Sequence, residues 1–214
     1  MRHPSDDDSG RERDLALIIR ALRDIGLPVQ SSDDLINTSR PYPEAIPVLV
    51  DLLSRSLHPD AIEVIVRSLT VREARGIAGK ALLWKFVELG HNDIESRIGG
   101  LQWSIGNALS VVADDGLSEE LLHVVSDRSY GRTREMIAIV LARSKDPRTV
   151  EVLVNLLKND EIPGHAIIAL GKVKAAEARP FIERYLTHTH AWVRMEARRA
   201  LAKIDRALAK RSRS

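Results

Sequence analysis

The sequence predicts an all-α protein: a right-handed α-solenoid of about five to six stacked antiparallel helix pairs, with no β-sheet. Two observations predict this fold class. The 214 residues include only two Phe, three Trp and three Tyr, so a core must be built mainly from Leu, Ile, Val and Ala, as in closely packed helices. Apolar residues also recur at helical spacing in two alternating series of segments. One such pair cannot bury its apolar stripe alone, whereas stacked pairs can.

The first series of segments carries a small residue followed by a Leu at a constant position. The clearest copy is 192–204, where the apolar residues of WVRMEARRALAKI form one stripe on a helix. The other segments align with it on their register leucines, and the six positions are Leu22, Leu69, Leu109, Leu141, Leu170 and Leu201. Successive leucines are 47, 40, 32, 29 and 31 residues apart, so the last three repeats are nearly uniform and the first two contain loops.

A second series of apolar segments lies between the helices of the first. Its members are AIPVLVDLL (45–53), KALLWKFV (80–87), LSEELLHVV (117–125), TVEVLVNLL (149–157) and ARPFIERYL (178–186). Their closing apolar residues are 34, 38, 32 and 29 residues apart. Both series therefore shorten together toward the C-terminus, as expected of one two-helix unit that is repeated.

Two arginines connect these repeats with a known family. Arg134 and Arg194 each precede a register leucine by seven residues, in a pattern that resembles the VRxxAAxAL motif of bacterial HEAT-like repeats of the phycocyanobilin-lyase type. The segment 45–53 is similar to the second-helix motif of that family, and the resemblance covers roughly residues 12–204. In two repeats the Arg position is occupied by Gln102 or Pro163. The resemblance implies an architecture. Members of the family range over scaffolds, lyase subunits and a few nucleic-acid enzymes, so it does not imply one activity.

The expected domain organisation is simple. Residues 1–11, rich in Asp, Ser, Pro and Gly, are expected to be a disordered acidic leader. A single domain is expected over 12–207, with loops at 27–43 and 90–96, and a basic tail over 208–214. The loop 27–43 is long for a compact fold, which indicates a functional or a mobile segment.

Several classes of protein are disfavoured by the sequence. Cysteine is absent, which excludes disulfide scaffolds, thiol nucleophiles and cysteine metal sites. No stretch suits a membrane span and no apolar signal segment follows Met1, so a cytoplasmic location is expected. The motifs of nucleotide binding, serine hydrolysis and zinc proteolysis are also missing. We therefore expect no enzyme activity and no cofactor. His188 and His190 could share a metal, but no third ligand is identifiable, and no metal site is predicted.

In such a fold the second-series helices line the concave side. The residue before each closing apolar pair should be exposed there, which predicts a binding column made of Asp51, Lys85, His123, Asn155 and Arg184. Because this column has mixed charge, it favours a protein partner over a phosphate backbone. The predicted function is a protein-binding scaffold or adaptor. A nucleic-acid binder, including one like the DNA glycosylases built from HEAT-like repeats, and a bilin-lyase-like chaperone are the alternatives.

Two further surfaces are predicted on the first series. The helix that contains Leu109 presents few charges outward. This predicts either an interface, including self-association, or a covering segment such as the loop 90–96. The residues of this predicted surface are Gln102, Trp103, Asn107 and Val111. The last helix carries a basic stripe, which fits a solvated end cap, an acidic partner or nucleic acid; it is formed by Arg199, Lys203, Arg206 and Lys210. Residues 192–214 hold eight basic and two acidic residues, a net charge of +6, and the rest of the chain sums to −4.

Overall fold

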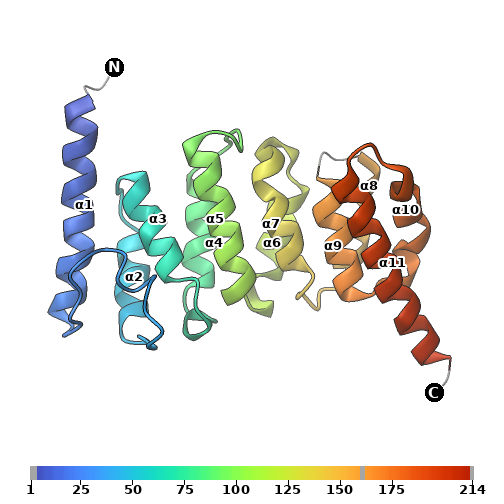
Figure 1. Ribbon diagram of the computed structural model, residues 1–214, viewed down its shortest axis with the longest axis horizontal. Helices are drawn as coiled ribbons and strands as arrows, with labels where there is room; N and C mark the ends of the chain where they lie inside the picture. Colours follow the sequence, from blue (N-terminus) through green and yellow to red (C-terminus); the bar gives the residue numbers. More distant parts are fainter. Residues whose placement is uncertain (1–3, 160–161, 213–214) are drawn as a thin grey trace. The chain divides into compact units, whose positions relative to one another are not determined.

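The computed structural model describes residues 4–159 and 162–212, and every regular element among them is a helix (Figure 1). This confirms the all-α prediction. The chain divides into two compact units, Met1–Asp114 and Asp115–Ser214. That residues 12–207 form one continuous domain stays a prediction.

The N-terminal unit contains five α-helices in two layers. They are α1 (Pro4–Asp24), α2 (Ala45–Leu53), α3 (Pro59–Ser68), α4 (Gly79–Glu88) and α5 (Arg97–Val112). Helix α3 packs between α1 and α5 to form the first-series layer, and α2 packs against α4 to form the second. A short 3₁₀ turn, Arg72–Ala74, precedes α4. The layers therefore alternate along the chain as the two sequence series predict.

The C-terminal unit repeats this arrangement with six α-helices. They are α6 (Ser118–Ser126), α7 (Glu135–Leu141), α8 (Thr149–Asn159), α9 (Pro163–Val173), α10 (Arg179–Glu183) and α11 (Ala191–Arg211). Helix α9 contacts both α7 and α11, while α8 contacts both α6 and α10. Four 3₁₀ segments occur among the described residues of this unit, and they are Asp115–Leu117, Arg128–Arg134, Ala176–Ala178 and Arg184–Thr187.

The register leucines occupy the core of both units. Five of them are at most 1% exposed and the sixth, Leu201, is 8% exposed. Small residues let neighbouring helices approach closely, most clearly where Gly171 of α9 faces Ala200 of α11. A Cβ added at Gly171 would lie 2.7 Å from the Cβ of Ala200. In the repeated pattern, the small residue therefore allows a close contact between helices, and the Leu belongs to the buried stripe.

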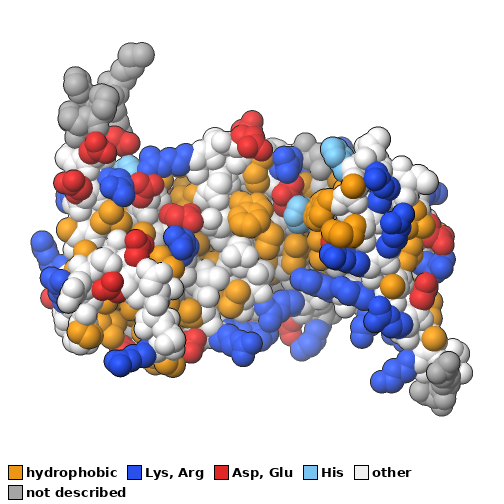
Figure 2. All heavy atoms as spheres, viewed as in Figure 1, with side chains coloured by type: hydrophobic (Ala, Val, Ile, Leu, Met, Phe, Trp, Pro, Cys, Tyr) orange, Lys and Arg blue, Asp and Glu red, His pale blue; other side chains and the backbone are white. Residues whose placement is uncertain are grey.

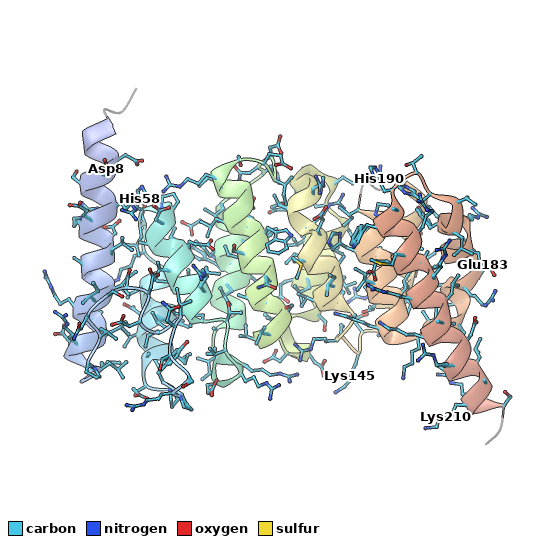
Figure 3. The ribbon with its side chains drawn as sticks, viewed as in Figure 1. Asp8, His58, Lys145, Glu183, His190 and Lys210 are labelled. Atoms are coloured by element: carbon cyan, nitrogen blue, oxygen red, sulfur yellow. The ribbon has the colours of Figure 1, made fainter. Side chains whose placement is uncertain are left out.

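The expected disordered leader is wrong for residues 4–11, because they form the first turns of α1. Acidic side chains near a helix N-terminus are favoured by the helix dipole. Contacts with α3 also hold this end: Oδ1 of Asp7 lies 3.2 Å from Nε2 of His58, and Nε of Arg11 donates to Asp60 over 2.7 Å. Figure 3 shows this end of α1, marked by Asp8, beside His58. Residues 1–3 lie outside the described part of the chain.

The other end of the chain and the long loop also differ in detail from expectation. Helix α11 continues to Arg211, so residues 208–211 of the expected basic tail are helical, and residues 213–214 lie outside the described part of the chain. No helix forms between Asp24 and Ala45, as predicted, but this loop packs into the core. Its Val29, Leu35 and Tyr42 are all buried.

Candidate functional site

The predicted binding column falls on both units. Asp51 and Lys85 belong to the N-terminal unit, and His123, Asn155 and Arg184 to the C-terminal unit. Four of the five side chains are exposed. In α2, α6 and α8 the column residue directly precedes two buried apolar residues, which is the pattern that predicted it. The binding role of the column stays a prediction.

Lys85 is the member of the column that the structure contradicts, because it is only 1% exposed. Its Nζ donates to the carbonyl oxygen of Arg55 over 3.3 Å and lies 2.6 Å from a carboxylate oxygen of Glu88. The apolar stem of a lysine can be buried while its amine reaches a polar partner. In KALLWKFV the inward pair therefore lies one residue earlier than the sequence pattern predicts. In α4 the inward pair is Lys85 and Phe86, and the preceding exposed residue is Trp84.

The corrected register reveals an exposed apolar strip along α4. Trp84 and Ile77 are each 52% exposed and Val87 is 45% exposed. Trp84 and Val87 are three residues apart within α4 and share one helical face, and Ile77 lies in the turn two residues before the helix begins. Lys80 is exposed one turn before Trp84, and Nζ of Lys85 lies over the Trp84 ring, 5.1 Å from its centroid. Large apolar side chains gathered at the surface mark interaction sites more often than scattered ones do.

A groove between α1 and α2 adds a second feature to the N-terminal unit. Its volume is about 480 Å³, and its lining combines apolar side chains with charges of both signs: Leu17, Arg20, Ala21, Asp24, Pro47, Val48, Asp51, Leu52 and Arg55. Asp51 and Arg55 form an ion pair of 2.7 Å at this groove. Because α2 contacts both α1 and α4, it lies between the groove and the apolar strip.

The four residues of the predicted outer-face interface on α5 differ in exposure. Trp103 is 39% exposed, Asn107 is exposed and Val111 is half-buried. Gln102 is completely buried, so its assignment to an interface is wrong. Its Nε2 donates to the carbonyl oxygens of Phe86 and Gly90, over 3.0 and 2.7 Å. Self-association through Trp103 stays a prediction.

The residues aligned with Gln102 explain why it is buried. Arg134 is 1% exposed, and its guanidinium donates to the carbonyl oxygens of Val125 and Gly131 over 2.7 and 2.9 Å. Arg194 likewise donates to the carbonyls of residues 188 and 189. The last carbonyls of a helix lack intrahelical partners, and the segment that follows has unpaired carbonyls of its own. The motif position therefore supplies a donor to backbone carbonyls, and an amide can replace the guanidinium there.

A pocket in the C-terminal unit brings together residues that sequence reasoning did not connect. Its volume is about 510 Å³, and it is lined by Arg132, Glu135, Ile162, Pro163, Gly164, His165, His188, His190, Trp192 and Val193. The ring centroids of His165 and Trp192 lie 5.2 Å apart. Trp192 also lies against Gly164, where an added Cβ would be 2.1 Å from the ring. The residues come from separate repeats, so no local sequence pattern marks the pocket.

In this pocket, the His165 and Glu135 side chains are not hydrogen-bonded to each other. Burial lowers the pKa of His165, although the nearby Glu135 carboxylate opposes the shift. Nε2 of His165 lies 3.7 Å from the Glu135 carboxylate, which is beyond hydrogen-bond distance. Glu135 instead accepts a hydrogen bond of 2.9 Å from Nε of Arg132. The rings of His188 and His190 are 5.5 Å apart, and among the described residues no group of three or more His, Asp and Glu side chains could hold a metal ion.

The predicted basic stripe on α11 is exposed at each of its four positions, which are Arg199, Lys203, Arg206 and Lys210. Arg199 forms an ion pair of 2.7 Å with Glu196 one turn earlier. Figure 2 shows Lys and Arg side chains gathered over α9 and α11. The stripe therefore belongs to a wider basic surface.

Comparisons with known proteins identify part of the chain. Residues 159–212, which include α9 to α11, match the family model for HEAT repeats. A crystal structure of an engineered protein is 22% identical in sequence, with a TM-score of 0.47, over 87% of this chain and 98% of the other. The sequence matches none of the curated proteins with which it was compared. Within the described residues, no helix combines the length and apolar character needed to cross a bilayer.

Proposed function

The chain is a HEAT-repeat protein, and from that premise we propose that it is a non-catalytic scaffold that binds a protein partner. The proposed contact surface is the α2–α4 face, defined by Asp51 on α2 and by Ile77, Trp84 and Val87 on and before α4. For the C-terminal unit by itself, the proposed contact positions are its exposed second-series residues His123, Asn155 and Arg184.

The main observation in support of this proposal is the exposure of Trp84. Tryptophan is among the residues most enriched in the energetically dominant positions of protein interfaces. At 52% exposure, a large part of its surface is left in water, and Ile77, in the turn before α4, is equally exposed. Burial of this area by a partner would be favourable at roughly 25 cal/mol per Å² of apolar surface. The strip therefore favours a partner that offers an apolar side chain at its centre.

The charges around the strip favour a protein over a phosphate backbone. Lys80 and Glu88 flank Trp84 on α4, and Asp51 of the neighbouring helix α2 pairs with Arg55, which lies just after that helix. A mixed rim around an apolar centre is the usual anatomy of a protein interface. The glycosylase-like alternative needs a basic track beside its aromatic residue. Trp84 meets the aromatic requirement, but the surrounding charges do not form such a track. The chaperone-like alternative has no observation in its favour beyond the resemblance of the repeats.

The test requires a partner that is identified and then purified. Affinity capture with the full chain, followed by mass spectrometry, would supply candidates, and calorimetry would measure Kd for each. Trp84→Ala is expected to weaken binding about 30-fold, the equivalent of a hot-spot loss of about 2 kcal/mol. Trp103→Ala is the matched control, since it removes an exposed Trp from a first-series helix of the same unit. Equal Kd values for Trp84→Ala and the wild type, or equal losses in both variants, would contradict the proposal.

A further inference from the structure

A second surface, on the first-series helices of the C-terminal unit, collects cations from three neighbouring repeats. Lys172 lies near the end of α9, Lys203 in α11, and Arg143 just beyond α7. Helix α9 contacts both α7 and α11, so these side chains come from adjacent elements. Burial and, after it, the charges of Lys203 and Arg143 lower the pKa of Lys172. Each of the three is exposed, so the cations share one open surface.

Helix α11 extends this surface along its own length. The exposed Arg199, Lys203, Arg206 and Lys210 follow one another at intervals of four, three and four residues, which keeps them on one face. At 1.5 Å per residue, the stripe is about 16 Å long. Figure 3 shows Lys210 at the far end of α11 from His190. We call the stripe, together with Arg143 and Lys172, the α7–α9–α11 basic face.

Ion pairs involve some cations of this face and not others. The two acidic residues of α11, Glu196 and Asp205, form ion pairs with Arg199 and Arg179. Among the described residues, neither Lys172 nor Lys203 has an ion-pair partner. Residues 115–214 contain 19 Lys and Arg against 13 Asp and Glu, a net charge of +6, whereas residues 1–114 contain 13 against 17, a net charge of −4. Clustered like charges repel one another in the folded state, and a bound polyanion would relieve that repulsion.

We infer that the α7–α9–α11 basic face binds the phosphate backbone of nucleic acid. Phosphate contacts by Lys and Arg release condensed counterions, and several aligned cations are the requirement for this mode of binding. An acidic protein fits less well. Lysine is depleted in protein interfaces, which usually contain aromatic anchors, and no aromatic residue occurs between Arg199 and Lys210. Because the face carries no element that reads base edges, binding depends on charge and is independent of sequence.

The inference is tested by the fluorescence anisotropy of a labelled 20-base-pair DNA duplex, titrated with the full chain between 50 and 200 mM salt. The test variant is Lys172→Gln with Lys203→Gln. It removes two phosphate contacts. It also removes the repulsion between the two lysine side chains, so we expect folding to be preserved. Affinity at 50 mM salt is expected to fall about 100-fold, and the slope of log K against log salt is expected to become shallower by about 2.

The matched control is Lys158→Gln with Arg184→Gln. It removes the same charge from the same unit, but on α8 and the turn after α10, where both cations lie over the ring of Phe181. This control should bind the duplex within a few-fold of wild type. Failure of the wild type to bind at 50 mM salt would overturn the inference, and so would equal losses in the two double variants. Tighter binding of a deca-glutamate peptide than of the duplex would overturn it in favour of an acidic protein. Trp84→Ala should leave duplex binding unchanged, so this result and the test of the proposed function are independent.

Discussion

Replacement of Gly171 by alanine tests whether the absence of a side chain sets the contact between α9 and α11. A Cβ at this position would lie 2.7 Å from the Cβ and 2.8 Å from the Cα of Ala200. Carbon atoms in contact prefer about 3.5 to 4.0 Å. The helices must therefore separate by about 1 Å, and because one of the clashing atoms is backbone, no side-chain rotation can avoid this.

The magnitude follows from two opposing contributions. Overpacking of a well-filled contact costs about 1–3 kcal/mol. Alanine regains about 1 kcal/mol relative to glycine in a helix interior. A net loss of about 1 kcal/mol in the free energy of unfolding is therefore expected. Gly100→Ala is the matched control, since Gly100 is helical and exposed, and its added Cβ would meet nothing within 4 Å. The control is expected to stabilise the chain by up to about 1 kcal/mol.

The assay is urea unfolding followed by circular dichroism, with linear extrapolation to water. A second substitution, Ala200→Gly, added to Gly171→Ala should restore part of the lost stability, because the volume moves from one helix to the other. The coupling energy between the two sites should be at least about 0.5 kcal/mol. If Gly171→Ala stabilises the chain as much as Gly100→Ala does, the reasoning about close approach at the repeat contact is refuted.

Four other predictions concern single side chains. Gln102→Leu leaves two backbone carbonyls without their donor and should cost about 2 kcal/mol in urea unfolding, whereas wild-type stability would show that these bonds contribute nothing. Tyr42→Phe removes a buried hydrogen bond of 2.9 Å to a backbone carbonyl of α3; a loss of about 1 kcal/mol is expected by the same measurement, and no loss would mean that the long loop is held by apolar contacts alone. NMR titration should give Asp146 a pKa of about 2, because Arg148 donates to its carboxylate, and Arg148→Ala should return it toward 3.8. Since the folded pKa is the lower one, this contribution to stability is complete above about pH 4 and is lost as the pH falls through about 2; a wild-type pKa near 3.8 would contradict the pair. Burial lowers the pKa of His165 below 6.5, so its neutral form is favoured in the fold and stability should fall as the pH drops below 6.5; an NMR pKa above 6.5 would mean that the nearby carboxylate outweighs burial.

The periodicity of the sequence was sufficient to predict the helices, because a helix that buries one stripe must repeat apolar residues at its own period. The register leucines illustrate this, since all six are buried as the alignment requires. The α4 segment shows where periodicity fails. Leu, Trp, Phe and Val follow one another there, and hydrophobicity alone cannot decide which of Trp84, Phe86 and Val87 faces inward. The inward position of Lys85 depends on the carbonyl of Arg55, just after α2, which no pattern within α4 reveals.

The candidate sites were predicted less completely than the fold. The exposure of Asp51 and of the basic stripe on α11 followed from helical spacing. Helical spacing predicted Gln102 to be at the surface. It could not reveal the burial of this side chain, because the carbonyls that Gln102 binds lie 12 and 16 residues earlier in the chain. The sequence did not predict the helical start of α1 for a similar reason. Acidic and flexible residue types predict disorder unless residues elsewhere in the chain pair with them.

By itself, the sequence determined the composition of the core, the alternation of two helix series and the repeat length, because these depend on the spacing of residues within one helix. Only the tertiary structure decided which polar side chains are buried, which aromatic side chains are exposed, and which cations from different repeats share a surface. Those properties depend on contacts between residues far apart in the chain, such as those between α9 and α11, and a one-dimensional pattern does not contain them.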